Sequence, residues 1–187
     1  MLTITGGNWK GRKVEVTPRL ITRYTPQFAR KALFDIIDVE GLRVLDLFSG
    51  SGIIAFEALS RSATNAVCID SSRVSCNTIK KNALKLGCQE KLRILCADFR
   101  RAIPKLEKSG ERFDFIFADP PFGENYIPEL LEVLERNAGI FSENACLVIE
   151  SSKKERELVK KYSGDASCLY DTREYGNVFL SFLKVVK

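Results

Sequence analysis

The most constraining feature of this sequence is an alternation, from Arg43 onward, between short runs of apolar and β-branched residues and longer amphipathic stretches. Short apolar runs predict strands, and apolar residues at a spacing of 3.6 predict helices. The predicted strands are 43–48, 65–70, 92–97, 113–118 and 145–150, and the predicted helices are 51–60, 72–86, 99–108 and 125–137. Connections of this length join parallel strands through right-handed crossovers. The pattern therefore predicts an α/β fold, with helices on the faces of a mostly parallel sheet.

The end of the chain breaks this alternation. A short helix is predicted at 153–161, followed by two β-rich runs at 167–173 and 177–186. Only Glu174-Tyr175-Gly176 separates the two runs, and so short a turn indicates an antiparallel hairpin at the end of the sheet. For the helices, we expect Ser72, Asp98 and Asn125 to act as N-terminal caps.

The segment before Arg43 stands outside the alternation. Gly6, Gly7 and Gly11 surround Trp9, which we interpret as a packing anchor, and Pro18 and Pro26 interrupt the stretch after these glycines. A helix is predicted at 26–38, with an apolar face made of Phe28, Leu33, Phe34 and Ile37. We expect residues 1–40 to form an extension that caps a main domain of residues 41–187. At 187 residues and 45% hydrophobic, the chain is effectively one domain with one core.

Positive charge is concentrated in this extension. The net charge is +5, yet residues 1–31 carry seven basic side chains against one acid, so the remaining residues sum to −1. Basic side chains bind phosphates largely without regard to sequence, which favours a nucleic-acid partner. The candidate phosphate contacts are Lys10, Arg12, Lys13, Arg19, Arg23 and Arg30. By contrast, the charged residues of 153–161 resemble a solvated helix face.

Several residue types narrow the chemistry. The chain has no histidine, which excludes Ser-His-Asp and Cys-His nucleophile systems and histidine-containing metal sites, and we expect no metal. Its six cysteines form no C-x-x-C pair and are interpreted as reduced core thiols. No apolar run reaches the roughly 18 residues of a membrane span, and the first residues do not resemble a signal peptide. We expect a cytoplasmic monomer.

Four acids lie at or near the ends of successive predicted strands: Asp46, Asp70, Asp98 and Asp119. Ligands of open parallel sheets bind at the carboxyl ends of the strands, so acids at these positions are candidates for binding or catalysis. A single strand-end aspartate is as often a helix cap or a turn residue. Four in succession favour a ligand site along one edge of the sheet.

The first acid precedes a glycine-rich turn, Phe48-Ser49-Gly50-Ser51-Gly52. Glycines allow a tight turn and let a ligand lie against the backbone. From Gly50 the sequence also fits G-x-G-x-x-A, and Asp70 lies 20 residues further on, where an acid is expected to bind a ribose. A nicotinamide- or flavin-dependent oxidoreductase is therefore one alternative, and any adenosine-containing cofactor fits the same features.

Asp119-Pro120-Pro121-Phe122 comes directly after the fourth predicted strand. Two consecutive prolines end a strand, which is a sufficient structural reason for them. The tetrapeptide also suits methylation of an exocyclic base amine, whose lone pair is delocalised into the ring. The Asp119 carboxylate and the Pro120 carbonyl could accept the two N–H groups of the amine, and Phe122 could stack on the extruded base. No histidine is needed, because positioning supplies most of the acceleration.

Together these motifs resemble those of class I S-adenosylmethionine-dependent methyltransferases. Gly6-Gly7-Asn8-Trp9-Lys10-Gly11-Arg12 and Ala58-Leu59-Ser60-Arg61 further resemble the RsmD-type family, which methylates N2 of a guanine in bacterial small-subunit (16S) rRNA. The resemblance covers nearly the whole chain and implies a Rossmann-like three-layer sandwich with a seven-stranded, mostly parallel sheet. The implied cofactor-binding residues are Asp46, Phe48, Ser49, Gly50, Gly52, Asp70, Ser71, Asp98 and Phe99, and the implied catalytic residues are Asp119, Pro120, Pro121 and Phe122.

This chain departs from the family pattern at two positions in the extension. The family usually reads R-P-T and then R-E, where this chain has Arg23-Tyr24-Thr25 and Arg30-Lys31. Alternatives also remain for the function. An adenine-N6 methyltransferase acting on DNA or RNA would use the same cofactor and a very similar motif. A non-catalytic RNA-binding module would share the basic extension.

Overall fold

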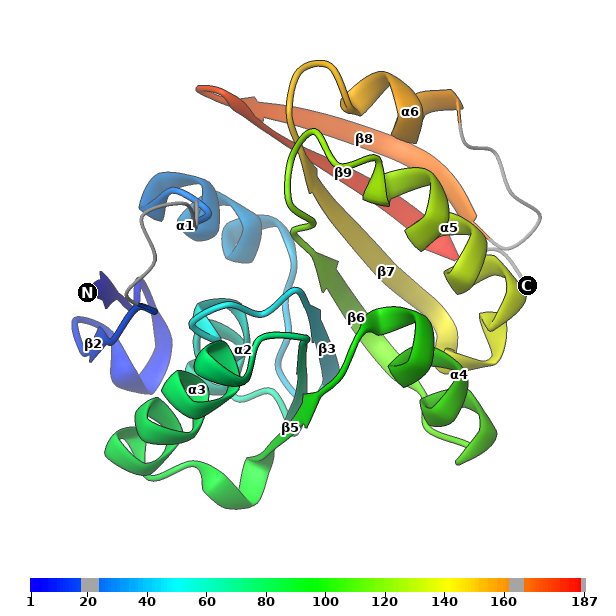
Figure 1. Ribbon diagram of the computed structural model, residues 1–187. Helices are drawn as coiled ribbons and strands as arrows, with labels where there is room; N and C mark the ends of the chain where they lie inside the picture. The colour runs from blue at the N-terminus through cyan, green and yellow to red at the C-terminus, as the bar shows by residue number, and fades with distance from the viewer. Residues whose placement is uncertain (18–23, 162–166, 186–187) are drawn as a thin grey trace.

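The computed structural model describes residues 1–17, 24–161 and 167–185. Its centre is a seven-stranded sheet of order β5-β4-β3-β6-β7-β9-β8 (Figure 1). The strands are β3 (Arg43–Leu47), β4 (Asn65–Asp70), β5 (Leu92–Cys96), β6 (Phe113–Ala118), β7 (Phe141–Ser151), β8 (Ser167–Tyr175) and β9 (Val178–Val185). Neighbours from β5 to β7 pair in parallel, whereas β9 is antiparallel to both β7 and β8. The predicted sheet and its terminal hairpin are confirmed.

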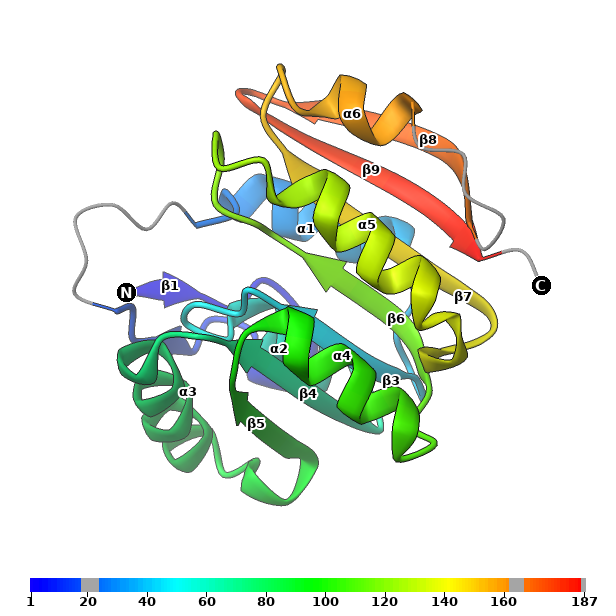
Figure 2. The ribbon, with the colours of Figure 1, turned by 45° about the vertical axis from the view of Figure 1, so that its right-hand side comes forward.

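Helices cover both faces of this sheet (Figure 2). One face carries α1 (Gln27–Ile36), α2 (Ile53–Ser60) and α3 (Arg73–Leu86), and the other carries α4 (Phe99–Lys108), α5 (Tyr126–Arg136) and α6 (Arg156–Lys161). Successive strand side chains alternate between the two cores, as the pleat requires. Val44 packs with the α2 and α3 side, for example, and Leu45 with the α4 and α5 side. Short 3-10 turns at Gly7–Trp9, Gln89–Lys91 and Ala138–Ile140 complete the assignment.

The N-terminal extension is tied to α2 through the two motifs that suggested the family. Strands β1 (Leu2–Thr3) and β2 (Lys13–Val14) form a small antiparallel sheet beside it. The Ser60 hydroxyl donates to the Gly6 carbonyl at 2.6 Å and accepts from the Trp9 N–H at 2.8 Å. Gly7 has φ +72°, and a Cβ there would lie 1.9 Å from the Ser60 carbonyl oxygen. Only glycine fits this approach, so the two motifs depend on each other.

Arg30 is part of a second tie between the extension and α2. Its side chain is fully buried, 3.5 Å from the equally buried carboxylate of Glu57, and it donates to the carbonyls of Thr25 and Thr3 at 2.9 and 2.8 Å. Burial lowers the pKa of the Arg30 guanidinium, and the Glu57 charge opposes that shift. The prediction that Arg30 contacts RNA phosphates is therefore wrong, because no phosphate can reach it.

Several smaller expectations also differ from the structure. Strand β7 begins at Phe141, earlier than predicted, because Phe141 pairs with Phe113 of β6 before the register shifts to the pair of Phe115 and Cys146. Phe28 is 56% exposed and is not part of the buried face of α1. Ser72 and Asp98 cap their helices as predicted, but Asn125 has φ 57° and makes no side-chain cap.

The cysteines only partly match their predicted role. Cys68, Cys76 and Cys88 are buried and free, but Cys96 is exposed, because it ends the edge strand β5. The Cys168 side chain lies outside the described part of the chain. Among the described residues, no helix is long and apolar enough to span a membrane.

Candidate active site

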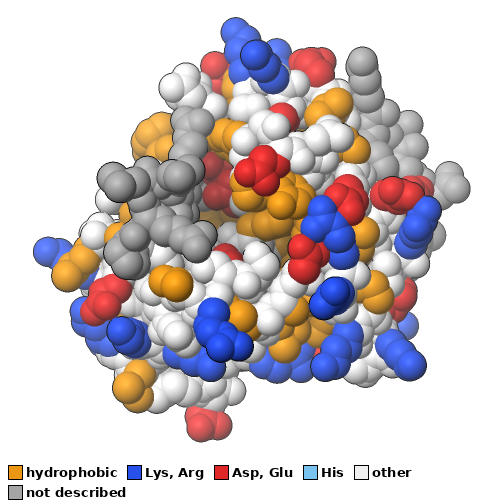
Figure 3. Space-filling view, viewed as in Figure 1, with side chains coloured by type: hydrophobic (Ala, Val, Ile, Leu, Met, Phe, Trp, Pro, Cys, Tyr) orange, Lys and Arg blue, Asp and Glu red, His pale blue; other side chains and the backbone are white. Residues whose placement is uncertain are grey.

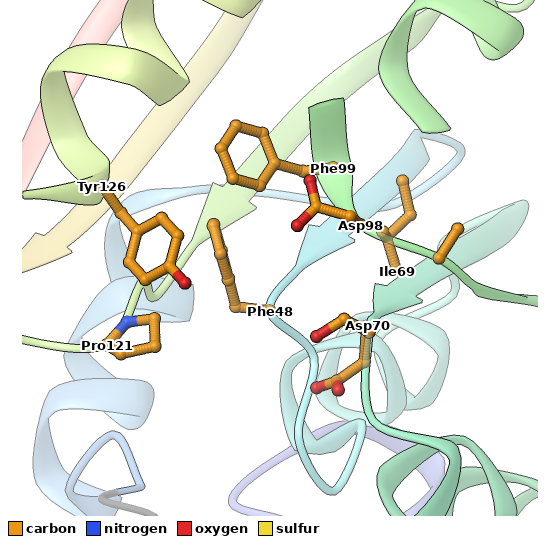
Figure 4. Close-up of a pocket in the computed structure, with 9 residues that line it drawn as sticks. Phe48, Ile69, Asp70, Asp98, Phe99, Pro121 and Tyr126 are labelled. Carbon is orange, nitrogen blue, oxygen red and sulfur yellow. The ribbon is translucent and has the colours of Figure 1, made fainter. Parts of the chain in front are cut away.

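The strand-end acids meet at one edge of the sheet, as predicted. The register pairs Leu47 with Ile69 on one side and with Ala118 on the other. The Asp119 N–H lies 3.4 Å from the Leu47 carbonyl, so Asp119 begins its loop beside Phe48 and the glycine turn. An open cleft of about 350 Å³ lies at this edge (Figure 4). Its lining residues are Phe48, Ile69, Asp70, Ser71, Ala97, Asp98, Phe99, Pro121 and Tyr126.

Hydrogen bonds with the end of β3 and within the turn itself fix the glycine turn. The Ser49 hydroxyl donates to the Asp46 carbonyl at 2.6 Å, and the Gly52 N–H donates to the Ser49 carbonyl at 2.7 Å. Gly52 has φ +77°, and a Cβ there would lie 2.9 Å from the ring of Phe56. These contacts fix the shape of the turn directly before α2.

Asp70 connects this turn to the neighbouring loop. One carboxylate oxygen accepts from the Gly50 N–H at 2.8 Å, and the other accepts from the Ser72 N–H at 2.8 Å. The side chain lies at the wall of the cleft (Figure 4). Both carboxylate oxygens of Asp70 are thus held in place by backbone N–H groups at the edge of the cleft.

Asp46 lies beneath the turn rather than in the lining of the cleft. Its carboxyl is 2% exposed and accepts from the Ala55 N–H at 3.3 Å. Burial raises its pKa to about 8, and the charge of Asp70 contributes to the rise. The position supports the glycine turn and the start of α2, so any effect of Asp46 on a ligand passes through them.

Both carboxylate oxygens of Asp98 accept hydrogen bonds from Arg100. Its Oδ1 accepts from the Arg100 N–H at 2.9 Å, and its Oδ2 pairs with the Arg100 guanidinium at 2.8 Å. The same guanidinium also binds Glu129 and lies over the rings of Phe99 and Tyr126, at 4.6 and 5.2 Å from their centroids. This network joins the start of α4 to the first turn of α5.

Tyr126 was not predicted from the sequence. Its ring lies 5.8 Å from that of Phe48 and 6.2 Å from that of Phe99, and the three rings form the apolar wall of the cleft (Figure 4). Such a wall suits a flat heteroaromatic group. The only sequence signal was an aromatic residue four positions after Phe122, at the start of a predicted helix.

The acid-diproline-phenylalanine loop is held on both sides. Pro120 is buried, whereas Pro121 faces the cleft. After Phe122, Gly123 has φ +82° and its N–H donates to a carboxylate oxygen of Glu155 at 2.8 Å. Glu155 is 8% exposed, so it does not belong to the solvated helix face that the sequence suggested.

Comparison with known proteins decides the family. A family model described as Conserved hypothetical protein 95 matches residues 2–184. Ribosomal RNA small subunit methyltransferase D of Escherichia coli (strain K12) is 33% identical over 157 residues, which are 80% of this chain and 74% of that protein. The chain belongs to the ribosomal RNA small subunit methyltransferase D family. Its Haemophilus influenzae member is 30% identical over 152 residues, covering 80% of this chain and 78% of its own.

Solved structures agree with the fold of this family. The structure of a hypothetical protein from Thermus thermophilus has a TM-score of 0.81 at 26% identity and covers 97% of this chain and 98% of its own. SMU.776, solved in complex with SAH, shares the fold with a TM-score of 0.70 at 15% identity, covering 95% of this chain and 52% of its own. Both solved structures thus share the fold of this chain.

The described basic residues of the extension do not line the cleft. Lys10, Arg12 and Lys13 are exposed, and the Arg12 guanidinium donates to the Lys85 carbonyl at 2.6 Å. Arg19 and Arg23 lie outside the described residues. Tyr24, where the methyltransferase D family usually has proline, lies with its ring 3.9 Å from the position of a Cβ on Gly50. This departure therefore changes the side chain that faces the glycine turn.

Proposed function

We propose that this chain methylates the N2 amine of a guanine in small-subunit rRNA, with S-adenosylmethionine as the methyl donor. The observation that carries the proposal is the shared edge of the sheet. Asp119 begins its loop beside the glycine turn, and Pro121 lines the same cleft as Asp70 and Phe48. The names of its relatives in Escherichia coli and Haemophilus influenzae support an rRNA substrate.

The cleft has the donors and acceptors that this cofactor requires. Asp70 offers oriented acceptors for the ribose hydroxyls, and the apolar wall of Phe48 and Phe99 suits the adenine. Ser71 and Asp98 lie on the same lining, and Ser49, Gly50 and Gly52 form the turn that would meet the methionine part. When bound, the cofactor supplies an electrophilic methyl group on a neutral leaving group.

The tetrapeptide supplies the orientation of the amine. The amine is a weak nucleophile, because its lone pair is delocalised into the ring. In the proposal, the Asp119 carboxylate and the Pro120 carbonyl accept its two N–H groups, and the ring of Phe122 stacks on the extruded base. The buried Pro120 and the bond from the Gly123 N–H to Glu155 keep this loop rigid, so little reorganisation is needed when charge develops.

The exposed lysines and arginine of the extension complete the proposal. Lys10, Arg12 and Lys13 would contact phosphates of the RNA, alone or within a small-subunit particle. The protein would act as a monomer in the cytoplasm. The nicotinamide alternative is set aside by the family and by the antiparallel β9, since dinucleotide-binding sheets of the common order 3-2-1-4-5-6 end in a parallel strand.

Two substitutions test the division of roles. Asp119→Ala should leave cofactor binding by calorimetry nearly unchanged and slow single-turnover methyl transfer severely, whereas Asp70→Ala should mainly weaken cofactor binding. Equal losses of both properties in both variants would contradict the assignment. A radiolabelled methyl donor offered to bulk RNA and DNA separates the remaining enzyme alternative, because recovery of N6-methyladenine in place of N2-methylguanine would favour the adenine methyltransferase.

A further inference from the structure

A second hollow lies beyond the acid-diproline-phenylalanine loop, between the turn after β7 and the turn that joins β8 to β9. It contains about 790 Å³ of empty space open to solvent. Its lining residues are Ser152, Lys153, Lys154, Glu174, Gly176, Asn177 and Phe179. Lys153 and Lys154 are exposed, and within the described part of the chain neither takes part in an ion pair. Figure 3 shows Lys and Arg side chains gathered at the top edge of the molecule.

An aromatic pair, exposed Phe28 and half-buried Tyr175, adjoins the other wall of this hollow. The rings of Phe28 and Tyr175 lie 6.1 Å apart, and Phe28 is 56% exposed. A Cβ on Gly176 would lie 3.8 Å from the tip of the Phe28 ring, so this ring reaches the lining of the hollow. Helix α1 thus presents Phe28 to solvent at the Gly176 wall of the hollow, and Lys153 and Lys154 belong to its other wall.

The hollow is mechanically linked to the catalytic loop. Glu155 comes directly after Lys154, and its carboxylate accepts from the Gly123 N–H at 2.8 Å and from the Ser152 N–H at 3.2 Å. One buried carboxylate therefore holds the turn that carries the lysines against the loop that carries Asp119. The backbone of the two lysines therefore keeps a fixed position relative to the base amine that this loop would orient.

We propose that Lys153, Lys154, Phe28 and Tyr175 form a flanking-nucleotide subsite, which binds the nucleotide next to the target base in single-stranded RNA. The lysine ammonium groups bind its phosphate, and its base stacks on the Phe28 ring. Stacking of this kind requires an unpaired base, and extrusion of the target leaves its neighbour without a stacking partner. Glu174, near the end of β8, lines the same wall as Gly176, so the phosphate approaches from the lysine wall. The proposal rests on an RNA substrate for the adjoining site.

The lysines are tested with a matched pair of variants. Lys153→Gln/Lys154→Gln removes two charges at the subsite, and Lys105→Gln/Lys108→Gln removes two exposed charges near the far end of α4. A helix rises 1.5 Å per residue, so Lys108 lies roughly 13 Å along α4 from Phe99 at the cleft. The probe is a fluorescein-labelled single-stranded RNA of mixed sequence, with binding followed by anisotropy at several KCl concentrations. We expect the slope of log affinity against log salt to fall by about 0.7 for the subsite variant and not for the control, because the two lysines together neutralise one phosphate.

The aromatic part has its own variant and control. Phe28→Ala should weaken binding of the same RNA at least about fivefold, the lower end of what one stacked base contributes, and Phe28→Tyr should retain it. Leu84→Ala, a truncation of a side chain that is 69% exposed on α3, should leave RNA binding unchanged. Melting temperatures of all variants should match the parent, because none of these side chains is buried.

The outcomes separate this inference from the proposed function. If the subsite variants bind the RNA as tightly and with the same salt slope as their controls, the subsite is refuted, whether or not the parent methylates RNA. If the parent binds the probe through the subsite but transfers no methyl group to small-subunit rRNA, the proposed function fails and the subsite stands. Equal loss of affinity for a duplex RNA probe would also overturn the subsite, since its stacking surface needs an unpaired base.

Discussion

The buried pair between Arg30 and Glu57 predicts a large stability loss when its acid is neutralised. Both side chains are fully buried, and Glu57 also accepts the Thr5 N–H at 2.9 and 3.0 Å and pairs with Arg61. Glu57→Gln keeps the shape of the side chain but turns an amide N–H toward these donors. Removing one partner of a buried pair costs about 3 to 5 kcal/mol, because the other charge stays in the interior without compensation.

Urea unfolding measures this loss. With a slope of about 1 to 3 kcal/mol per molar urea, the unfolding midpoint of Glu57→Gln should fall by at least about 1 M. Asp35→Asn is the control, because it breaks an exposed pair with Lys31 on the same helix and should cost less than about 1 kcal/mol. A loss for Glu57→Gln no larger than that of Asp35→Asn would refute the reasoning.

The same pair tests whether Arg30 is a structural residue. Arg30→Met should destabilise the fold, and combining it with Glu57→Leu should recover much of the loss, because replacing both partners with apolar groups leaves no buried charge. RNA affinity of the folded double variant should equal that of the parent. A stable Arg30→Met protein with weakened RNA binding would instead make Arg30 a phosphate contact.

Further predictions concern the turn and its surroundings. Asp46 has a pKa of about 8 in the folded state against 3.8 unfolded, so the folded state holds this proton more tightly. Its contribution to the free energy of unfolding is complete in acid and declines as pH rises from about 4 to about 8. Urea unfolding across this range should show a weaker decline for Asp46→Asn. Gly52→Ala should cost at least about 1 kcal/mol, since φ is +77° and the methyl would meet Phe56, and calorimetry should show weaker cofactor binding. Ser72→Ala should lose about 1 kcal/mol in the same urea assay, because the Ser75 N–H loses its cap, while single-turnover transfer at saturating cofactor stays unchanged.

The layers of the fold and the edge of the sheet that carries the candidate site could be predicted from the sequence alone. Strand and helix periodicity is a local property, and the parallel crossovers follow from the length of the connections. The short turn at 174–176 was enough to predict the final hairpin, and parallel strands bring their carboxyl ends to one edge. Asp70 and Asp119 could therefore be placed at a common edge before their contacts were known.

The role of each charged or aromatic side chain at this edge depended on contacts that the folded chain alone reveals. The sequence predicts Arg30 as a phosphate contact, but in the structure Glu57, 27 residues away, neutralises it. The sequence likewise predicts Glu155 as solvated, but its carboxylate accepts a hydrogen bond from Gly123, 32 residues away. Phe28 shows the reverse, since it sits on a predicted apolar face and is exposed. The physical reason is common to all three. Burial and compensation depend on partners that are distant in the sequence, and local patterns carry no information about which distant groups the fold brings together.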